Sequence, residues 1–223
     1  PATTSIYPLE RRTWASSEHN LDIQAAFSTM YELTGEPKWL EGAEHASAFI
    51  ETMWDHSIGC YRSGTGNPNT RNENEGQLPV DVQAWSVLVD STVLTRHPNV
   101  LGCADEKHAI TTDGFDGFDF NDDRDGVWFE GTAHLVVAYG VAQQDALQNR
   151  YLQELQRAQQ TPPFGDGSGI AAASHDGLTS GFEANHRDHN AFKYFRRLHI
   201  GATAWHLFAQ LEFNPYYQTK TGP

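Results

Sequence analysis

Two nearly identical phrases decide the fold: Leu21-Asp22-Ile23-Gln24-Ala25 and Val80-Asp81-Val82-Gln83-Ala84. Each phrase begins a stretch in which apolar residues recur at helical spacing. A repeated start of this kind indicates that two helices begin at equivalent places in a repeated unit. We therefore expect their two carboxylates to face the same space, and we interpret Gln24 and Gln83 as hydrogen-bonding partners between adjacent helices.

Helical patterns recur along the rest of the chain. Ser16 and Ser17 are N-cap candidates for a helix that ends at Gly35, and Pro37 begins a second helix, so the pair forms an antiparallel hairpin. Further helices are predicted over 79–93, 105–110, 127–142, 147–155 and 199–211, with loops over 63–77 and 162–190. Inner-type helices, which are apolar on most faces, alternate with outer-type helices that carry a single apolar stripe.

The predicted inner helices start near Asp22, Asp81, Glu130 and His199. Hairpins packed side by side make these helices parallel, so their amino ends open on one rim of a central cavity. Acid and base groups are concentrated at that rim, namely Glu18, His19, Asp22, Asp81, Asp125, Glu130 and His199. Because the longest connecting loops also lie there, we expect the functional site at this rim.

Composition excludes several function classes. The 223 residues include 15 basic and 29 acidic ones, a net charge of -14, which argues against nucleic acid and anionic membrane as partners. No stretch approaches the roughly 18 apolar residues that span a bilayer. Cys60 and Cys103 fit a disulfide in a secreted protein and two free thiols equally well. Motifs for nucleotides, zinc and nucleophilic serine are absent from the sequence, so neither a cofactor nor a metal is predicted.

One acidic loop leaves an alternative open. Asn121-x-Asp123-x-Asp125-Gly126 matches the first half of an EF-hand loop, but Thr132 stands where the closing glutamate would be. The main prediction is a loop with Asx turns and Asp–Arg pairing that shapes the cleft. The alternative is a different calcium site that uses Asp119, Asp122, Asp123 or Asp125.

Four stretches resemble the six-hairpin, (α/α)-toroid glycosidase superfamily, and in particular a secreted branch of it: residues 17–22 (SEHNLD), 80–85 (VDVQAW), 117–133 (GFDFNDDRDGVWFEGTA) and 197–205 (RLHIGATAW). The resemblance implies an all-α fold, a carbohydrate substrate and a secreted or periplasmic protein. A complete toroid of this kind has six hairpins, whereas about four inner helices are predicted here. Residues 1–223 are therefore expected to form a single, incomplete (α/α)-toroid domain, either the C-terminal part of a longer chain or a ring completed by oligomerisation.

The resemblance and the rim acids together predict a glycoside hydrolase that cleaves an oligo- or polysaccharide by carboxylate general acid/base catalysis. Glu130 is the predicted general acid, because a carboxyl beside Trp128 would have its pKa raised by desolvation. The competing interpretation pairs Glu130 with Arg124 or Arg197. Asp81 or Asp22 is predicted to orient or deprotonate water, and Glu18 completes the catalytic set. The predicted substrate-binding residues are Trp14, His19, Trp85, Arg124, Asp125, Trp128, Tyr194, Arg197, His199 and Trp205.

Two other functions remain open at this level. A toroid polysaccharide lyase or sugar epimerase would use His19, His199 or Tyr194 as its base. A non-catalytic glycan-binding module would keep the fold but lack a complete set of acid and base groups.

Overall fold

A computed structural model describes residues 14–66, 78–183 and 191–216 of the chain. The helices of this part are α1 (Ser17–Thr34), α2 (Pro37–Thr52), α3 (Val80–Val89), α4 (Val93–Arg96), α5 (Val100–His108), α6 (Phe129–Val141), α7 (Asp145–Gln160) and α8 (Ile200–Gln210). The strands are β1 (Trp54–Asp55), β2 (Cys60–Tyr61), β3 (Ala109–Thr112), β4 (Phe115–Phe118), β5 (Leu178–Glu183) and β6 (Ala191–Tyr194). They pair as three antiparallel two-stranded hairpins, β1–β2, β3–β4 and β5–β6.

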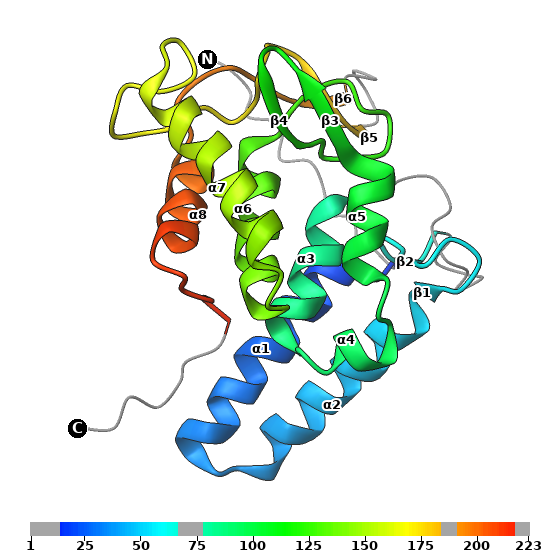
Figure 1. Cartoon of the computed structure of the whole chain (residues 1–223). Coiled ribbons are helices and arrows are strands. Elements are labelled where there is room, and N and C mark those ends of the chain that lie inside the picture. The colour runs from blue at the N-terminus through cyan, green and yellow to red at the C-terminus, as the bar shows by residue number, and fades with distance from the viewer. Residues whose placement is uncertain (1–13, 67–77, 184–190, 217–223) are drawn as a thin grey trace, which may run out of the picture.

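The helices form a partial ring of helical hairpins. The inner helices pack in the order α1, α3, α6, α8, while α2 packs on α1 and α7 packs on α6 (Figure 1). Hairpins β3–β4 and β5–β6 lie together at the top of the view, beyond the ends of α5 and α6 (Figure 1). The fold is therefore the (α/α) toroid that the sequence predicts, with four inner helices in the described residues.

The first hairpin forms as its sequence predicts. The Ser16 hydroxyl accepts a hydrogen bond from the backbone N–H of His19 at 3.4 Å, which caps α1. Gly35 ends α1 in the left-handed region, with φ of 68°, which a side chain would disfavour. Pro37 then occupies the first turn of α2, where its missing N–H costs no hydrogen bond.

Inner helices differ in burial according to their place in the row. Helices α3 and α6 have neighbours on both sides and are buried on most faces. The end helices α1 and α8 are not, since the side chains of Leu33 and Leu207 are 75% and 50% exposed. Apolar residues on most faces therefore go with burial on most faces in α3 and α6 but not in α1 and α8.

The segment after α8 runs back to the start of the row. The side-chain amide of Asn214 donates to the carbonyl of Leu88 at 2.8 Å, at the end of α3. The Tyr216 hydroxyl donates to Oδ1 of Asp22 on α1 at 2.9 Å. These contacts tie α8 to α3 and α1.

Several element predictions need correction. The helix expected over 79–93 is interrupted because Asp90 is extended and its carboxylate accepts from the backbone N–H of Thr92. The helix expected over 105–110 ends at His108, and the residues after it pair as β3. The loop expected over 162–190 contains β5, which pairs with β6, the next strand along the chain.

Gln83 does not bind a neighbouring inner helix. Its side-chain oxygen accepts from the N–H of Tyr61 and its amide donates to the carbonyl of the same residue, both at 2.8 Å. In the second copy of the repeated phrase, Gln83 therefore attaches α3 to β2.

Cys60 and Cys103 form a disulfide, with 5.5 Å between their Cα atoms. The bond joins β2 to α5, and both residues are buried. The two cysteines are therefore not free thiols, which was the other possibility that the sequence left open.

Among the described residues, no helix combines the length and the apolar character needed to cross a bilayer.

Candidate active site

A cavity of about 400 Å³ lies at the amino ends of the four inner helices. Hairpin β5–β6 and the residues after β4 supply the rest of its wall. The lining residues are Glu18, Asp81, Trp85, Phe120, Trp128, Glu130, His134, Ser180, Phe192, Tyr194 and His199. The structure thus brings together seven residues that the sequence singled out, namely Glu18, Asp81, Trp85, Trp128, Glu130, Tyr194 and His199.

Glu130 lies in the first turn of α6, and its side chain is 17% exposed. Desolvation by burial raises the pKa of Glu130 to about 7, so the carboxyl is half protonated near neutral pH. Its Oε2 lies 3.2 Å from Nδ1 of His199. The competing interpretation, an ion pair with Arg124 or Arg197, is wrong for the described residues, since Arg124 binds backbone carbonyls, Arg197 lies over Phe195 and the Glu130 carboxyl lies against His199.

His199 Nδ1 has two neighbours that compete for it. As the N-cap of α8, it accepts from the backbone N–H of Ala202 at 3.2 Å. A nitrogen that accepts from Ala202 carries no proton to donate to Glu130, so a hydrogen bond between the two side chains then requires protonated Glu130. The contact therefore favours the acid form of Glu130 while His199 caps α8.

Asp81 and Glu18 form a carboxyl pair across α3 and α1. Asp81 is 2% exposed, and its Oδ1 accepts from the backbone N–H of Val82 at 2.7 Å. Burial, and then the charge of Glu18 and a hydrogen bond with it, raise the pKa of Asp81 well above its usual range. Two adjacent carboxyls in a sheltered site do not both ionise easily, so the pair favours a protonated Asp81 that donates a hydrogen bond to Glu18. Glu18 is the more exposed partner.

Tyr194 cannot easily supply a phenolate. Burial, followed by the charges of Asp81 and Glu130, raises its pKa above the ordinary value of 10.0. Its ring packs on Trp128 with 5.2 Å between centroids. Tyr194 is therefore a neutral wall residue, which removes one of the three bases considered for lyase or epimerase chemistry.

The other predicted aromatic and acidic residues lie outside the cavity lining. Asp22 faces away from it, toward the hydroxyl of Tyr216. Trp14 stacks on His19 with 6.5 Å between centroids, and its side chain is largely exposed. Trp205 packs behind the wall, against Trp85 and His134. Asp22 is thus not placed as the partner of Glu130.

Arg124, Asp125 and Arg197 have structural contacts. The Arg124 guanidinium donates to the backbone carbonyls of Glu106 and Lys107, so the predicted Asp–Arg pairing in this loop is wrong. Asp125 accepts from the backbone N–H of Thr179 on β5 at 3.0 Å. Arg197 lies over the ring of Phe195.

Four lining residues were not identified from the sequence: Phe120, His134, Ser180 and Phe192. Ser180 and Phe192 belong to the hairpin β5–β6, which was expected to be a loop. A signal for His134 did exist, since it follows Glu130 by four residues and therefore shares its helix face.

The acidic loop after β4 is internally hydrogen-bonded. Carboxylate oxygens of Asp119, Asp123 and Asp125 lie within 4.8 Å of one another. Asp123 accepts from the N–H of Asp125, an Asx turn as predicted, and its other oxygen accepts from the Thr179 hydroxyl. Burial and a hydrogen bond with Asp123 raise the pKa of Asp119 to about 8. The loop thus fixes β5 beside the cavity, and calcium binding there stays a prediction.

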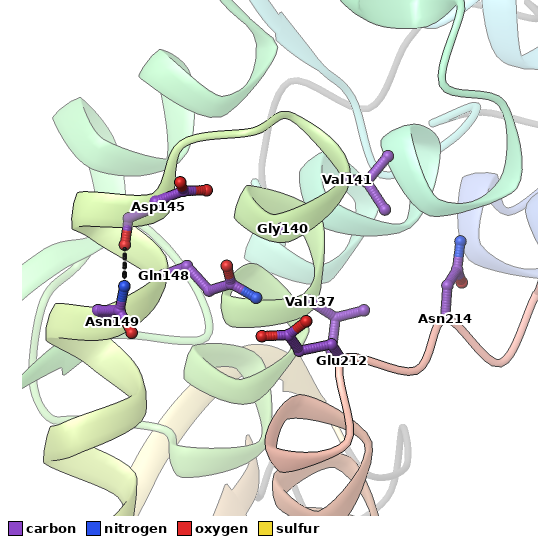
Figure 2. A pocket seen from close by; sticks show the side chains of 8 residues that line it. All are labelled: Val137, Gly140, Val141, Asp145, Gln148, Asn149, Glu212 and Asn214. Atoms are coloured by element: carbon purple, nitrogen blue, oxygen red, sulfur yellow. Dashed lines mark hydrogen bonds between the residues drawn. The ribbon is translucent and has the colours of Figure 1, made fainter.

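A second cavity, of about 510 Å³, lies at the opposite end of α6. Figure 2 shows Asp145, Gln148 and Asn149 of α7 facing Glu212 and Asn214 across it. Val137 and Val141 of α6 add apolar side chains to its lining. This cavity is separate from the acid cluster of the first.

Gly201, in the first turn of α8, leaves room for the Glu130 carboxyl. A Cβ at Gly201 would lie 2.5 Å from Oε1 and 2.7 Å from Oε2 of Glu130. Gly201→Ala is therefore expected to push the flexible carboxyl into the open cavity and lower its pKa from about 7 toward the ordinary value of 4.5. Carboxyl ¹³C NMR titration of labelled Glu measures this.

Gly169→Ala is the matched control. Its Cβ would meet Leu198 at 3.5 Å, an ordinary van der Waals contact. An unchanged Glu130 titration in Gly201→Ala would contradict the role given to Gly201.

Neither the known protein-family models nor the curated protein sequences include a match to this chain. Among solved structures, the fold is similar to a family 88 glycosyl hydrolase from Bacteroides vulgatus (TM-score 0.57, 12% identity, 92% of this chain and 63% of that chain). It is also similar to a family 76 glycoside hydrolase from a bovine Bacteroides thetaiotaomicron strain (TM-score 0.52, 14% identity, 92% and 45%). A third match is an inactive variant of a Salegentibacter α-1,6-mannanase in complex with α-1,6-mannotetrose (TM-score 0.52, 11% identity, 90% and 54%).

A polysaccharide lyase and a cellobiose 2-epimerase share the fold as well, so the architecture is common to several reactions. This chain spans only 45% to 63% of the length of the three hydrolases. At these identities the likeness concerns architecture alone. The chain has the fold of the six-hairpin, glycosidase-like (α/α) toroids and covers about half of one.

Proposed function

We propose that the protein hydrolyses glycosidic bonds of a neutral oligo- or polysaccharide at the cavity where the inner helices begin. The observation that carries this proposal is the buried Glu130, whose pKa of about 7 matches that of a general acid at neutral pH. The same cavity holds the Asp81–Glu18 carboxyl pair and is lined by aromatic rings, which suit the faces of sugar rings.

In the proposed reaction Glu130 donates its proton to the glycosidic oxygen as the bond to the anomeric carbon breaks. Glu18, the more exposed carboxyl of the pair with Asp81, accepts the proton of the attacking water. Protonated Asp81 donates a hydrogen bond that holds Glu18 in place. The role of base moves here from Asp81 and Asp22, which the sequence favoured, to Glu18.

The charge of the cavity favours hydrolysis over elimination. A lyase that acts on a uronate has to neutralise the sugar carboxylate, usually with a cation. The described lining holds three carboxyls and neither lysine nor arginine. His134 adds no charge, because burial lowers its pKa to about 3. An anionic sugar would therefore be repelled, whereas a neutral one would not.

Two further features belong to this proposal. The Cys60–Cys103 disulfide supports a secreted or periplasmic location, because such bonds persist in oxidising compartments. The fold shared with an enzyme that binds α-1,6-mannotetrose makes α-1,6-mannan a reasonable first substrate to test.

The test is a panel of neutral and uronate-containing glycans with product analysis. Hydrolysis of a neutral glycan is expected to raise the number of reducing ends without new ultraviolet absorbance. Absorbance from an unsaturated product would support the lyase alternative, and isomerisation without new reducing ends would support the epimerase. Binding without any product would support the glycan-binding module.

A further inference from the structure

The acidic loop after β4 contains one buried side-chain oxygen without a hydrogen-bond partner. It is Oδ1 of Asn121, a residue that is only 3% exposed. Among the described residues, the other buried side-chain atoms without a partner are ring nitrogens and hydroxyls, which are not ligands of hard cations in this setting. An amide oxygen only accepts, so its burial requires either a donor or a cation beside it.

Three carboxylates lie next to this amide. Its Nδ2 donates to Oδ2 of Asp123 at 3.1 Å, which places the Asn121 amide at the edge of the cluster. One carboxylate oxygen each of Asp119, Asp123 and Asp125 lies within 4.8 Å of the other two. Two oxygens that bind the same calcium ion, each at about 2.3 to 2.6 Å, lie at most about 5 Å apart. One calcium ion therefore fits between the three carboxylates.

The charge of this cluster is not balanced by a basic side chain of the described residues. Arg124, the basic residue inside the loop, donates to two backbone carbonyls of α5. No ion pair of the described lysines and arginines includes the three carboxylates. Asp119 is fully buried, whereas Asp123 and Asp125 are exposed. A cation can thus enter from the solvent side, where water can complete its coordination.

The spacing of the loop supports the same ion. Asn121, Asp123, Asp125 and Gly126 stand at positions 1, 3, 5 and 6 of an EF-hand loop, so the unpaired oxygen belongs to the position of the first ligand. The closing glutamate of that motif is missing, and Asp119, which precedes the loop, adds a carboxylate instead. Asp122, which the sequence also suggested, is not part of the cluster.

We propose that Asn121, Asp119, Asp123 and Asp125 bind one calcium ion, which fastens β5 beside the cavity. Calcium takes six to eight oxygen ligands in flexible geometry, which suits a carboxylate and amide set of this kind. The Thr179 hydroxyl and N–H on β5 donate to Asp123 at 2.6 Å and to Asp125 at 3.0 Å. A carboxylate has about four acceptor sites, so it can keep these bonds and bind the ion. The site does not depend on the proposed hydrolysis.

Calorimetry with calcium chloride, after dialysis against EGTA and then chelator-free buffer, tests the site directly. Saturable binding of one ion per chain is expected, and calcium at about 100 times its dissociation constant should raise Tm by about 5 to 10 °C. Magnesium chloride at the same concentration is the control for general screening of the net charge of -14, since magnesium demands near-octahedral geometry. Absence of saturable calcium binding, or an equal rise of Tm with magnesium, would overturn the proposal.

Asn121→Asp separates a ligand from a structural residue. With calcium, a carboxylate at the first ligand position adds charge to the site and is expected to tighten binding about tenfold. In EGTA, the same carboxylate is buried beside three others and should lower Tm. A structural asparagine would give the same loss of Tm under both conditions, and that result would overturn the proposal.

Asp125→Asn removes one charge but keeps an oxygen that can accept from the N–H of Thr179, so the fold should persist. Calcium affinity is expected to fall at least about tenfold. Asp166→Asn is the matched control, because the Asp166 carboxylate also accepts from loop N–H groups, those of Ser168 and Gly169, but lies outside the cluster. Wild-type calcium affinity in Asp125→Asn, or an equal loss in Asp166→Asn, would contradict the assigned site.

Discussion

Glu130→Gln is expected to lower kcat by about 100-fold to 10,000-fold, the usual contribution of a positioned proton donor. The amide matches the carboxyl in shape but cannot supply an acidic proton to the leaving oxygen. Glycan binding should change little, because the aromatic walls remain. Steady-state kinetics on the glycan identified by the panel give kcat, and calorimetry gives the affinity.

The control for Glu130→Gln is Glu154→Gln on α7, which removes a carboxylate that contacts the backbone N–H of Asp116, away from the cavity lining.

Wild-type activity should fall above pH 7, because the acid form of Glu130 is lost as pH rises through its pKa of about 7. The free energy of unfolding should fall over a similar pH range. Because the pKa of Glu130 is about 7 in the folded protein and 4.5 ordinarily, protonated Glu130 stabilises the fold at low pH, and this contribution is lost between about pH 4.5 and 7. A Glu130→Gln enzyme with most of its activity would remove Glu130 from the mechanism.

The second large effect concerns stability. Replacing both cysteines, as Cys60→Ala with Cys103→Ala, is expected to lower the free energy of unfolding by about 4 kcal/mol, given the 43-residue separation that the bond closes. Urea denaturation followed by circular dichroism measures the change. The loss arises mainly because the unfolded chain regains conformational freedom.

Reduction of the wild-type disulfide is the matched control, since it breaks the bond without changing buried side-chain volume. Both proteins should lose similar stability. If the double variant unfolds within about 1 kcal/mol of the oxidised wild type, the entropic account of this bond is wrong.

The sequence predicted the parts of the site that lie on helices. Glu18, Asp81, Glu130 and His199 each stand at or next to a helix start, and helix starts have local signals in caps, prolines and apolar spacing. Parallel packing of those helices then brings the four groups to one cavity. Their common location follows from repeated hairpins, without knowledge of any distance.

The sequence could not predict what depends on contacts between distant segments. Hairpin β5–β6 is local, but Ser180 and Phe192 reach the cavity because Thr179 binds Asp123 and Asp125, more than 50 residues earlier. The partner of Asp22 is Tyr216, 194 residues away. Burial set the roles of Asp81 and Glu18, since only the structure shows which carboxyl is more exposed.

The β5–β6 hairpin has a consequence for how specificity can change. It contributes wall residues to the cavity but none of the three carboxyls. The acidic loop holds it from outside the cavity, through Thr179. One part of the cavity wall is therefore carried by a segment that holds none of the acids, whereas Trp85 and His134 share helices with Asp81 and Glu130. Ligand preferences can change by substitution within one short hairpin, while the helix starts that carry the acids keep their positions.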